Sequence, residues 1–183
     1  MPSRCDCAGE VALRDGSTVR VRSVRAEDAA AVRCLFQGLS ETSRWLRWFS
    51  ACPSLDCVVA WATRVDHARR CGLVATVAGN ERLIAHAGFE RDDQHPDRAE
   101  FAMVVADDFQ GRGLGAILLG RLAEVADRAG VATLTGEVLA DNQPMLRMLR
   151  HSGFPVSFRR TSGVVLVELP TSLTRGAGTV QAA

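Results

Sequence analysis

The chain of 183 residues contains no lysine and no tyrosine, so arginine supplies all 22 of its strongly basic side chains. The missing lysine excludes a P-loop nucleotide site, because that loop needs a lysine to reach the phosphates. A net charge of +1 gives no general attraction to nucleic acid or to an anionic membrane. No apolar run reaches the roughly 18 residues of a membrane span, and the opening MPSRCDCAGE lacks the apolar segment of a secretory signal. We therefore expect a cytoplasmic protein that binds neither nucleic acid nor membrane.

Nothing in the cysteine pattern indicates a metal site. The six cysteines form no CxxC pair, and no matching pair of histidines follows them. Thiols without such a pattern are typical of a reducing compartment. We expect free thiols and no bound metal at Cys5, Cys7, Cys34, Cys52, Cys57 and Cys71.

Hydrophobic periodicity indicates one compact domain in which strands and helices alternate. Strand patterns cover residues 16–24, 72–78, 82–90, 99–106, 131–139, 154–160 and 163–169. Helical spacing covers a short segment at 40–50 and longer segments at 26–38, 54–66, 113–129 and 142–152. This order predicts an α/β protein with a mixed, mostly antiparallel sheet of about six or seven strands flanked by about four helices. We place the domain at residues 13–170, between flexible segments at 1–12 and 171–183.

Three glycines lie close together between a predicted strand and a predicted helix, in the stretch FAMVVADDFQGRGLGAILL. A helix N-terminus presents unpaired N–H groups and a partial positive charge, and glycine lets the backbone close on an anion. Residues 110–115 therefore predict a pyrophosphate site, with Arg112 as an added positive charge. Gly111, Gly113 and Ala116 also match the dinucleotide fingerprint, with Glu137 downstream, but that fingerprint normally follows the first strand of its domain. A tight turn without a ligand is the other alternative.

QGRGLG resembles the (Gln/Arg)-x-x-Gly-x-(Gly/Ala) signature of the GNAT superfamily of N-acetyltransferases. The neighbouring strand and helix and the downstream DNQPMLRMLRHSGF are also similar to that superfamily, and the resemblance covers residues 13–169. More narrowly, LRDGSTVRVRSVRAEDA, LSETSRWLRWFS and VADDFQGRGLG resemble the catalytic domain of the bacterial protein-lysine acetyltransferases. Members of that group acetylate an active-site lysine of acyl-CoA synthetases, and some carry an added regulatory domain for which we expect no room here. The resemblance implies a GNAT-like fold, acetyl-CoA as cosubstrate and a protein acceptor with a reactive lysine.

The resemblance also implies which residues hold acetyl-CoA. The pyrophosphate would lie on the amides of the glycine-rich segment, and the pantetheine arm would pair with the exposed backbone of the preceding strand. An amide at Met103 or Val104 would then face the thioester carbonyl as an oxyanion donor. The cofactor-binding residues implied in this way are Met103, Val104, Val105, Gln110, Gly111, Arg112, Gly113, Leu114, Gly115 and Asn142.

The acceptor amine must lose a proton, which costs about 4 kcal/mol at pH 7.4 for a free lysine. In GNAT protein acetyltransferases a glutamate in the strand before the glycines acts as general base, often through a water, and Glu100 is at this position. Alternation along the strand puts Glu100, Ala102 and Val104 on one face. The alternatives are Glu90 as the base, or Glu100 as a solvated carboxylate paired with Arg98.

The missing tyrosine removes the general acid that many GNAT enzymes place in the downstream helix, because Leu149 occupies that position. The loss need not stop the reaction, since a thiol with a pKa of about 8.5 leaves without much help. His151 is near in sequence, but a histidine at the end of a helix has an ordinary explanation. We expect structural or solvated roles for His67, His86 and His95, which show no ligand spacing.

The aromatic segment SRWLRWFS resembles the acceptor side of the lysine acetyltransferases, which implies Arg44, Trp45 and Trp48 as acceptor-binding residues. An amphipathic helix with its aromatic side chains packed inward is the alternative.

Two other functions stay open. One is acetylation of a small amine such as a polyamine, an amino acid or an aminoglycoside, and the other is non-catalytic acyl-CoA sensing. The combination of Glu100 with QGRGLG favours an enzyme.

Overall fold

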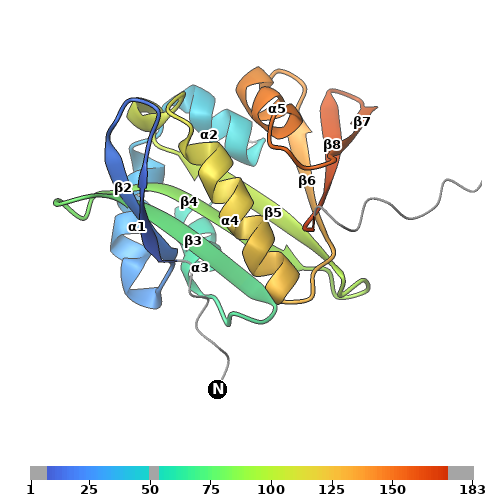
Figure 1. Ribbon diagram of the computed structural model, residues 1–183, viewed down its shortest axis with the longest axis horizontal. Coiled ribbons are helices and arrows are strands. Elements are labelled where there is room, and N and C mark those ends of the chain that lie inside the picture. The colour runs from blue at the N-terminus through green and yellow to red at the C-terminus, as the bar shows by residue number, and fades with distance from the viewer. Residues whose placement is uncertain (1–7, 50–53, 173–183) are drawn as a thin grey trace, which may run out of the picture.

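The computed structural model of the chain describes residues 8–49 and 54–172. They form one eight-stranded sheet in the order β1-β2-β3-β4-β5-β6-β8-β7, with helices on both faces (Figure 1). The strands are β1 (Gly9–Ala12), β2 (Thr18–Ser23), β3 (Arg70–Val77), β4 (Leu83–Arg91), β5 (Arg98–Val105), β6 (Thr133–Leu139), β7 (Ser157–Thr161) and β8 (Val164–Pro170). The helices are α1 (Ala29–Gln37), α2 (Glu41–Trp48), α3 (Leu55–Thr63), α4 (Leu114–Arg128) and α5 (Gln143–Arg150), with 3-10 turns at Ala26–Asp28 and Asp107–Phe109.

Only one pair of neighbouring strands in this sheet is parallel. β1 to β5 form a continuous antiparallel series, and β6, β8 and β7 form a second one. The parallel pair β5–β6 joins the two series, and α4 provides the crossover between its strands. The glycine-rich loop consequently lies at the end of a central strand, where open α/β sheets commonly bind ligands.

The helices cover the two faces of the sheet unequally. α4 crosses the front face in Figure 1 and packs on β3, β4 and β5, while α1, α2 and α3 lie behind the sheet. β3 and β4 are buried along most of their length, as expected for strands that are covered on both sides. Leu118, Leu119 and Leu122 of α4 are fully buried, and burying a side chain of this kind contributes about 1.5–3 kcal/mol.

The predicted mixed, mostly antiparallel sheet is confirmed, but the count of its strands was too low. The sequence put residues 9–12 in a flexible N-terminal segment, whereas they form β1 and pair with β2. This strand is short and begins with glycine, so its own pattern carries little signal. A turn closed by a 2.8 Å hydrogen bond from the Leu13 N–H to the Ser17 carbonyl folds it back onto β2. The predicted flexible tail 171–183 also begins too early, because Thr171 is buried and its hydroxyl donates to the Val131 carbonyl at 2.7 Å. The rest of the two predicted flexible segments, residues 1–7 and 173–183, lies outside the described residues.

The described part of the chain contains no helix that is long and apolar enough to cross a membrane. In the same residues, no group of His, Cys, Asp and Glu side chains is arranged to hold a metal ion. Cys34 and Cys57 are exposed free thiols, and the side chain of Cys71 is buried. The expectations for Cys5, Cys7 and Cys52 fall on residues outside the described ranges.

Candidate functional site

Strands β5 and β6 diverge after a short parallel pairing. Residues 98–100 pair with residues 133–135, although β5 continues to Val105 and β6 to Leu139. In the described structure, the backbone of residues 101–105 therefore has no strand partner on the β6 side. The gap encloses about 290 Å³, and we name it the interstrand cleft. Its lining residues are Leu46, Arg47, Trp48, Phe49, Glu100, Phe101, Ala102, Met103, Gly136, Glu137, Val138, Asn142 and Met145.

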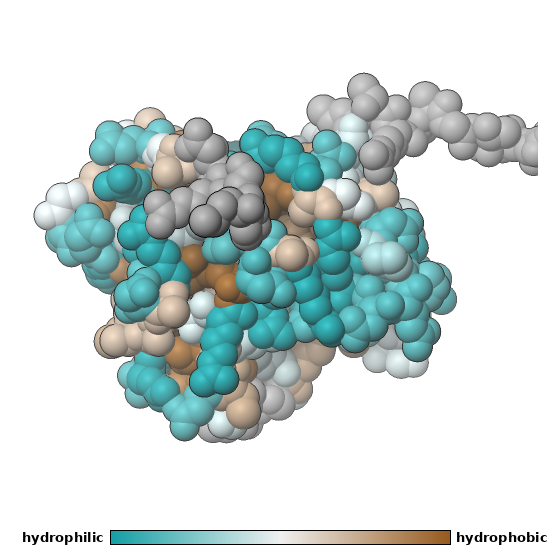
Figure 2. All heavy atoms as spheres, turned by 90° about the horizontal axis from the view of Figure 1, so that it is seen from below, coloured by the Kyte–Doolittle hydropathy of each residue, from teal (hydrophilic) through white to brown (hydrophobic). Residues whose placement is uncertain are grey.

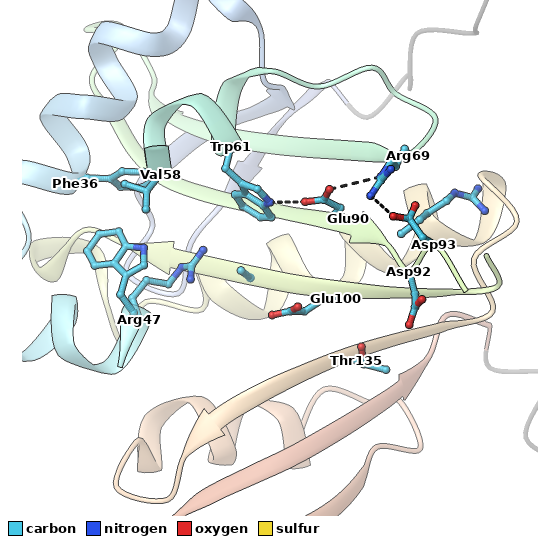
Figure 3. Close-up of a pocket in the computed structure, with 13 residues that line it drawn as sticks. Phe36, Arg47, Val58, Trp61, Arg69, Glu90, Asp92, Asp93, Glu100 and Thr135 are labelled. Carbon is cyan, nitrogen blue, oxygen red and sulfur yellow. Dashed lines mark hydrogen bonds and ion pairs between the residues drawn. The ribbon is translucent and has the colours of Figure 1, made fainter. Parts of the chain in front are cut away.

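A second cleft of about 490 Å³ lies between the sheet and the helices behind it, and we name it the helix-side cleft (Figure 3). Its lining residues are Phe36, Arg47, Trp48, Val58, Trp61, Arg69, Glu90, Arg91, Asp92, Asp93, Glu100, Ala102 and Thr135. The two clefts share Arg47, Trp48, Glu100 and Ala102, so they meet where α2 lies beside β5. Figure 2 shows the molecule from below, where hydrophobic atoms lie at the bottom of a hollow in a mostly hydrophilic surface.

The glycine-rich loop has a backbone that requires glycine at two positions. Gly111 has a φ of +75° and Gly113 a φ of +91°, which side-chain-bearing residues adopt only with strain. A Cβ atom at Gly111 would meet nothing within 4 Å, so the space above the loop is open. Among the described residues, the N–H groups of residues 111–115 have no hydrogen-bond acceptor. Free N–H groups at the start of α4 fit the predicted binding of a pyrophosphate.

Hydrogen bonds attach this loop to α2. The carboxylate of Asp107 accepts from the N–H and hydroxyl groups of Ser40, at 2.9 and 2.8 Å, and from the Ser43 hydroxyl at 2.6 Å. Burial opposes ionisation of Asp107, but these hydrogen bonds hold its pKa below the ordinary carboxyl value. The Gln110 side chain donates to the Ser43 hydroxyl and to the Val105 carbonyl. α2 therefore has a fixed position relative to the loop.

Arg112 points its guanidinium group along the side of the loop. It pairs with Asp15 at 2.7 Å and lies over the Phe109 ring, 4.6 Å from the ring centre. The turn between β1 and β2 lies against the loop, because the Arg14 N–H donates to the Arg112 carbonyl at 3.0 Å. The Arg14 side chain also packs on Gly113. Two arginines thus border the loop, where the sequence indicated one.

Glu100 and Glu90 lie in different electrostatic environments. The exposed Glu100 side chain lines both clefts, and its expected partner Arg98 pairs with Glu168 instead. Glu90 accepts hydrogen bonds from the Trp61 indole at 2.8 Å and from Arg70 at 2.7 Å. Burial opposes the ionisation of Glu90, but these hydrogen bonds keep its pKa below the usual value. Two polar partners therefore hold Glu90 in its ionised form, whereas Glu100 has no hydrogen bond and no ion pair within the described residues.

Arg47 lines both clefts, although no separate role for it was predicted from the sequence. Its guanidinium lies 5.8 Å from the centre of the Trp48 ring and 5.9 Å from that of Trp61. Burial lowers the pKa of Arg47 to about 10, against the opposing attraction of Glu100. Figure 3 shows Arg47 and Glu100 extending into the helix-side cleft. The same positive charge contributes, after burial, to lowering the pKa of His86 to about 4.

The predicted acceptor residues do not all lie at the clefts. Trp48 lines both and packs edge-on against Phe36, with ring centres 5.4 Å apart. Arg44 and Trp45 line neither cleft, and 51% of Trp45 is exposed. The alternative of a helix with all its aromatic side chains inward is therefore wrong for Trp45. Trp45 lies one turn before Trp48 on α2, but its side chain stays in contact with solvent.

The predicted cofactor residues outside the glycine-rich loop differ in how they face the clefts. Met103 and Asn142 line the interstrand cleft, and the Asn142 carboxamide also caps α5 by accepting from the Met145 N–H at 3.2 Å. Val104 has a buried side chain and lines neither cleft, so it is available only through its backbone. The Val105 carbonyl accepts a hydrogen bond from the Gln110 side chain. Leu149, which occupies the position of the general acid in many GNAT enzymes, is fully buried.

Comparisons with known proteins agree with this geometry. Residues 40–154 match the model of a family described as the Acetyltransferase (GNAT) family. Acetyltransferase Pat of Mycolicibacterium smegmatis is 32% identical over 130 residues, which are 71% of this chain and 39% of that protein. Acetyltransferase PA5475 of Pseudomonas aeruginosa is 30% identical over 148 residues, 78% of this chain and 77% of that protein. The crystal structure of the GNAT domain of S. lividans PAT matches with a TM-score of 0.81 and 30% identity, over 93% of this chain and 99% of that domain.

Proposed function

The chain belongs to the acetyltransferase (GNAT) family, and we propose that it transfers the acetyl group of acetyl-CoA to a lysine side chain of a protein such as an acyl-CoA synthetase. The observation that carries this proposal is the meeting of two clefts at Glu100. One cleft follows the free backbone of β5, and the other opens between the sheet and the helices. A cofactor and an acceptor can thus approach one carboxylate from two directions.

The interstrand cleft and the glycine-rich loop suit acetyl-CoA. Its diphosphate would lie on the N–H groups at the start of α4, and its pantetheine arm would lie along Met103, Val104 and Val105 beside Asn142. Acetyl-CoA supplies an acetyl group activated as a thioester. The backbone N–H of Met103 or Val104 would face the thioester carbonyl, where a fixed donor stabilises developing negative charge.

Glu100 would act as the general base. An acceptor lysine enters as an ammonium ion with a pKa of about 10.4, and its proton must leave before the nitrogen can attack the thioester carbon. The Glu100 carboxylate is exposed to both clefts and has no hydrogen bond or ion pair within the described residues, so it can take this proton directly or through a water. Proton transfer of this kind contributes about 100-fold or more to the rate.

The proposal of a protein acceptor rests on the named relatives and on the surface around the helix-side cleft. Two relatives carry the names Pat and PAT, and both match this chain at 30% identity or more. Trp48 forms part of the cleft, and Arg44 and the exposed Trp45 lie one turn earlier on the same helix, where aromatic and arginine side chains suit a protein contact. We propose the cytoplasm as the place of the reaction.

Two measurements test this function in order. Calorimetry with acetyl-CoA should give one binding site per chain, and the absence of binding by folded protein would remove the cofactor assignment. Incubation of the protein with radiolabelled acetyl-CoA and a cell lysate should then label a protein, with an acyl-CoA synthetase among the labelled bands. Label found only in small metabolites would show a small-amine acetyltransferase. Binding of acetyl-CoA without transfer to any amine would show a sensor.

A further inference from the structure

Arg47 is a positive charge without a hydrogen-bonded or ion-paired partner among the described residues, placed where the two clefts meet. Within the described residues its guanidinium forms no hydrogen bond and no ion pair, whereas Arg22, Arg69, Arg70, Arg82, Arg98 and Arg112 all pair with carboxylates. The two flanking tryptophan rings attract a cation but do not neutralise it. Burying a charge that no hydrogen bond or ion pair compensates costs free energy, and such charges are often found at functional sites. Arg47 is therefore a candidate to bind an anion that forms only during the reaction.

The reaction creates an anion at this place. When the amine nitrogen bonds to the acetyl carbon, the carbonyl oxygen takes up an electron pair, and the nitrogen loses its proton to the base. The carbonyl then re-forms, the carbon–sulfur bond breaks, and the sulfur leaves with its electron pair as a thiolate. Negative charge therefore passes from oxygen to sulfur in the interstrand cleft. No tyrosine exists in this chain to protonate the sulfur, and the buried Leu149 offers no hydrogen.

We infer that the guanidinium of Arg47 stabilises the negative charge that develops on the thioester during transfer, in place of an absent general acid. This inference rests on the function proposed above. Arg47 lines the cleft that follows β5 as well as the cleft proposed for the acceptor, so its charge is near both reactants. A fixed cation is already oriented before the reaction and requires no rearrangement when the anion forms.

The charge of Arg47 affects the ionisable side chains around it. Its charge acts on two side chains from different strands, since it interacts with Glu100 on β5 and helps to keep His86 on β4 neutral. Trp48 and Trp61 hold the guanidinium from two sides, and Trp61 is itself fixed by its hydrogen bond to Glu90. These contacts fix the position of Arg47 without consuming its hydrogen-bond donors.

The test measures thiol release from acetyl-CoA with Nα-acetyl-lysine amide, an acceptor that carries no negative charge of its own. Replacing Arg47 by Gln should lower kcat by about 100-fold while the affinity for acetyl-CoA, measured by calorimetry, stays close to that of the parent. Arg47→Lys keeps a positive charge and should retain an intermediate rate. Arg64→Gln, an exposed arginine at the end of α3, serves as the matched control and should keep the parent rate.

A rescue experiment separates the charge of Arg47 from its bulk. Guanidinium ions should restore part of the activity of Arg47→Ala, whereas urea, which has a similar shape but no charge, should not. Equal rescue by urea, an unchanged kcat in Arg47→Gln, or a rise in acceptor KM alone would each overturn the inference. A parent protein that releases no thiol with any amine would overturn the proposed function as well. The activity of the parent protein therefore shows whether the Arg47 inference alone has failed or the proposed acetyltransferase function with it.

Discussion

The carboxylate of Asp107 accepts a 2.6 Å hydrogen bond from the hydroxyl group of Ser43, which joins the end of β5 to the helix α2. Ser40, at the N-cap of α2, donates to the same carboxylate twice. α2 carries Arg47 and Trp48, which line both clefts. This contact therefore sets the distance between the glycine-rich loop and the residues proposed to face the reaction.

Replacing Asp107 by Ala should loosen α2 and weaken the binding of acetyl-CoA. The change removes three hydrogen bonds to a charged group, and because the site is exposed we expect an increase in Kd of about 5-fold rather than more. Calorimetry measures the affinity. Asp127→Ala, an exposed carboxylate on α4, is the control and should bind as the parent does. An unchanged Kd in Asp107→Ala would mean that α2 keeps its position without this link.

Gly113 in the glycine-rich loop and Gly120 within α4 allow a matched test of backbone strain. Gly113 has a φ of +91°, and a Cβ there would come 3.3 Å from the Arg14 side chain, so Gly113→Ala should destabilise the fold by about 1–2 kcal/mol. Gly120, within α4, has space for a Cβ, so Gly120→Ala should stabilise it by about 0.5–1 kcal/mol.

Urea denaturation of both variants measures these changes. Only Gly113→Ala should also weaken the binding of acetyl-CoA, because only that change distorts the loop. Equal stabilities of the two variants would contradict the loop conformation described here.

The glycine-rich loop could be predicted from sequence because its requirements are local. Glycine at residues 111 and 113 allows a positive φ, and the strand and helix on either side follow from periodicity. The place of Glu100 near the start of β5 could be predicted in the same way, whereas its proposed role as the base came from the family resemblance. These are the parts of the site where a residue's neighbours in sequence are also its neighbours in space.

The role of Arg47 could not be predicted, because it depends on how α2 packs on the sheet. Arg44 and Arg47 are three positions apart on one helix and look equivalent in the sequence. The contact of Asp107 with Ser43 is formed across 64 residues, and it is one of the contacts that decide which face of α2 meets the clefts. The divergence of β5 from β6 likewise leaves no periodic pattern, and only the family resemblance indicated it.

The free energy of unfolding should decrease on mild acidification, because the fold buries His86 in its neutral form. Its side chain is buried against Phe36 and Trp61, and burial lowers its pKa to about 4 from an ordinary value near 6.5. Between these values the unfolded chain binds a proton that the folded chain does not, so stability is full above pH 6.5 and is lost as the pH falls. From pH 7.5 to pH 5 the loss should be about 2 kcal/mol.

Urea denaturation at the two pH values measures this loss, and His86→Phe should largely remove the dependence. That variant should also be less stable by about 1 kcal/mol at pH 7.5, because the Ala62 carbonyl loses its contact with the ring nitrogen. His95→Gln is the control, since this histidine is exposed, and it should keep the parent dependence. A parent protein equally stable at both pH values would mean that His86 is protonated in the fold.

Substituting the two glutamates should separate the base from a structural carboxylate. Glu100→Gln should lower kcat by about 100-fold at pH 7.4 with little change in acetyl-CoA affinity, because it removes a proton acceptor and keeps the shape. The deficit should shrink toward pH 10, where a growing fraction of the lysine acceptor is already neutral. Glu90→Gln should lower kcat by less than about 10-fold at any pH. Its main effect should be a loss of about 1 kcal/mol of stability through the weakened contacts with Arg70 and Trp61.

The pH dependence of these two variants decides the assignment, because a damaged fold would lower the rate at every pH. Thiol release from acetyl-CoA, followed from pH 7 to pH 10 with Nα-acetyl-lysine amide, gives the profile for each protein. A Glu100→Gln deficit that stays constant across this range would remove Glu100 as the base and leave it as a residue that orients the acceptor. A larger deficit in Glu90→Gln than in Glu100→Gln would move the base to β4, where Glu90 lies directly opposite Glu100 in the strand pairing, and the acceptor would then have to enter beside Trp61.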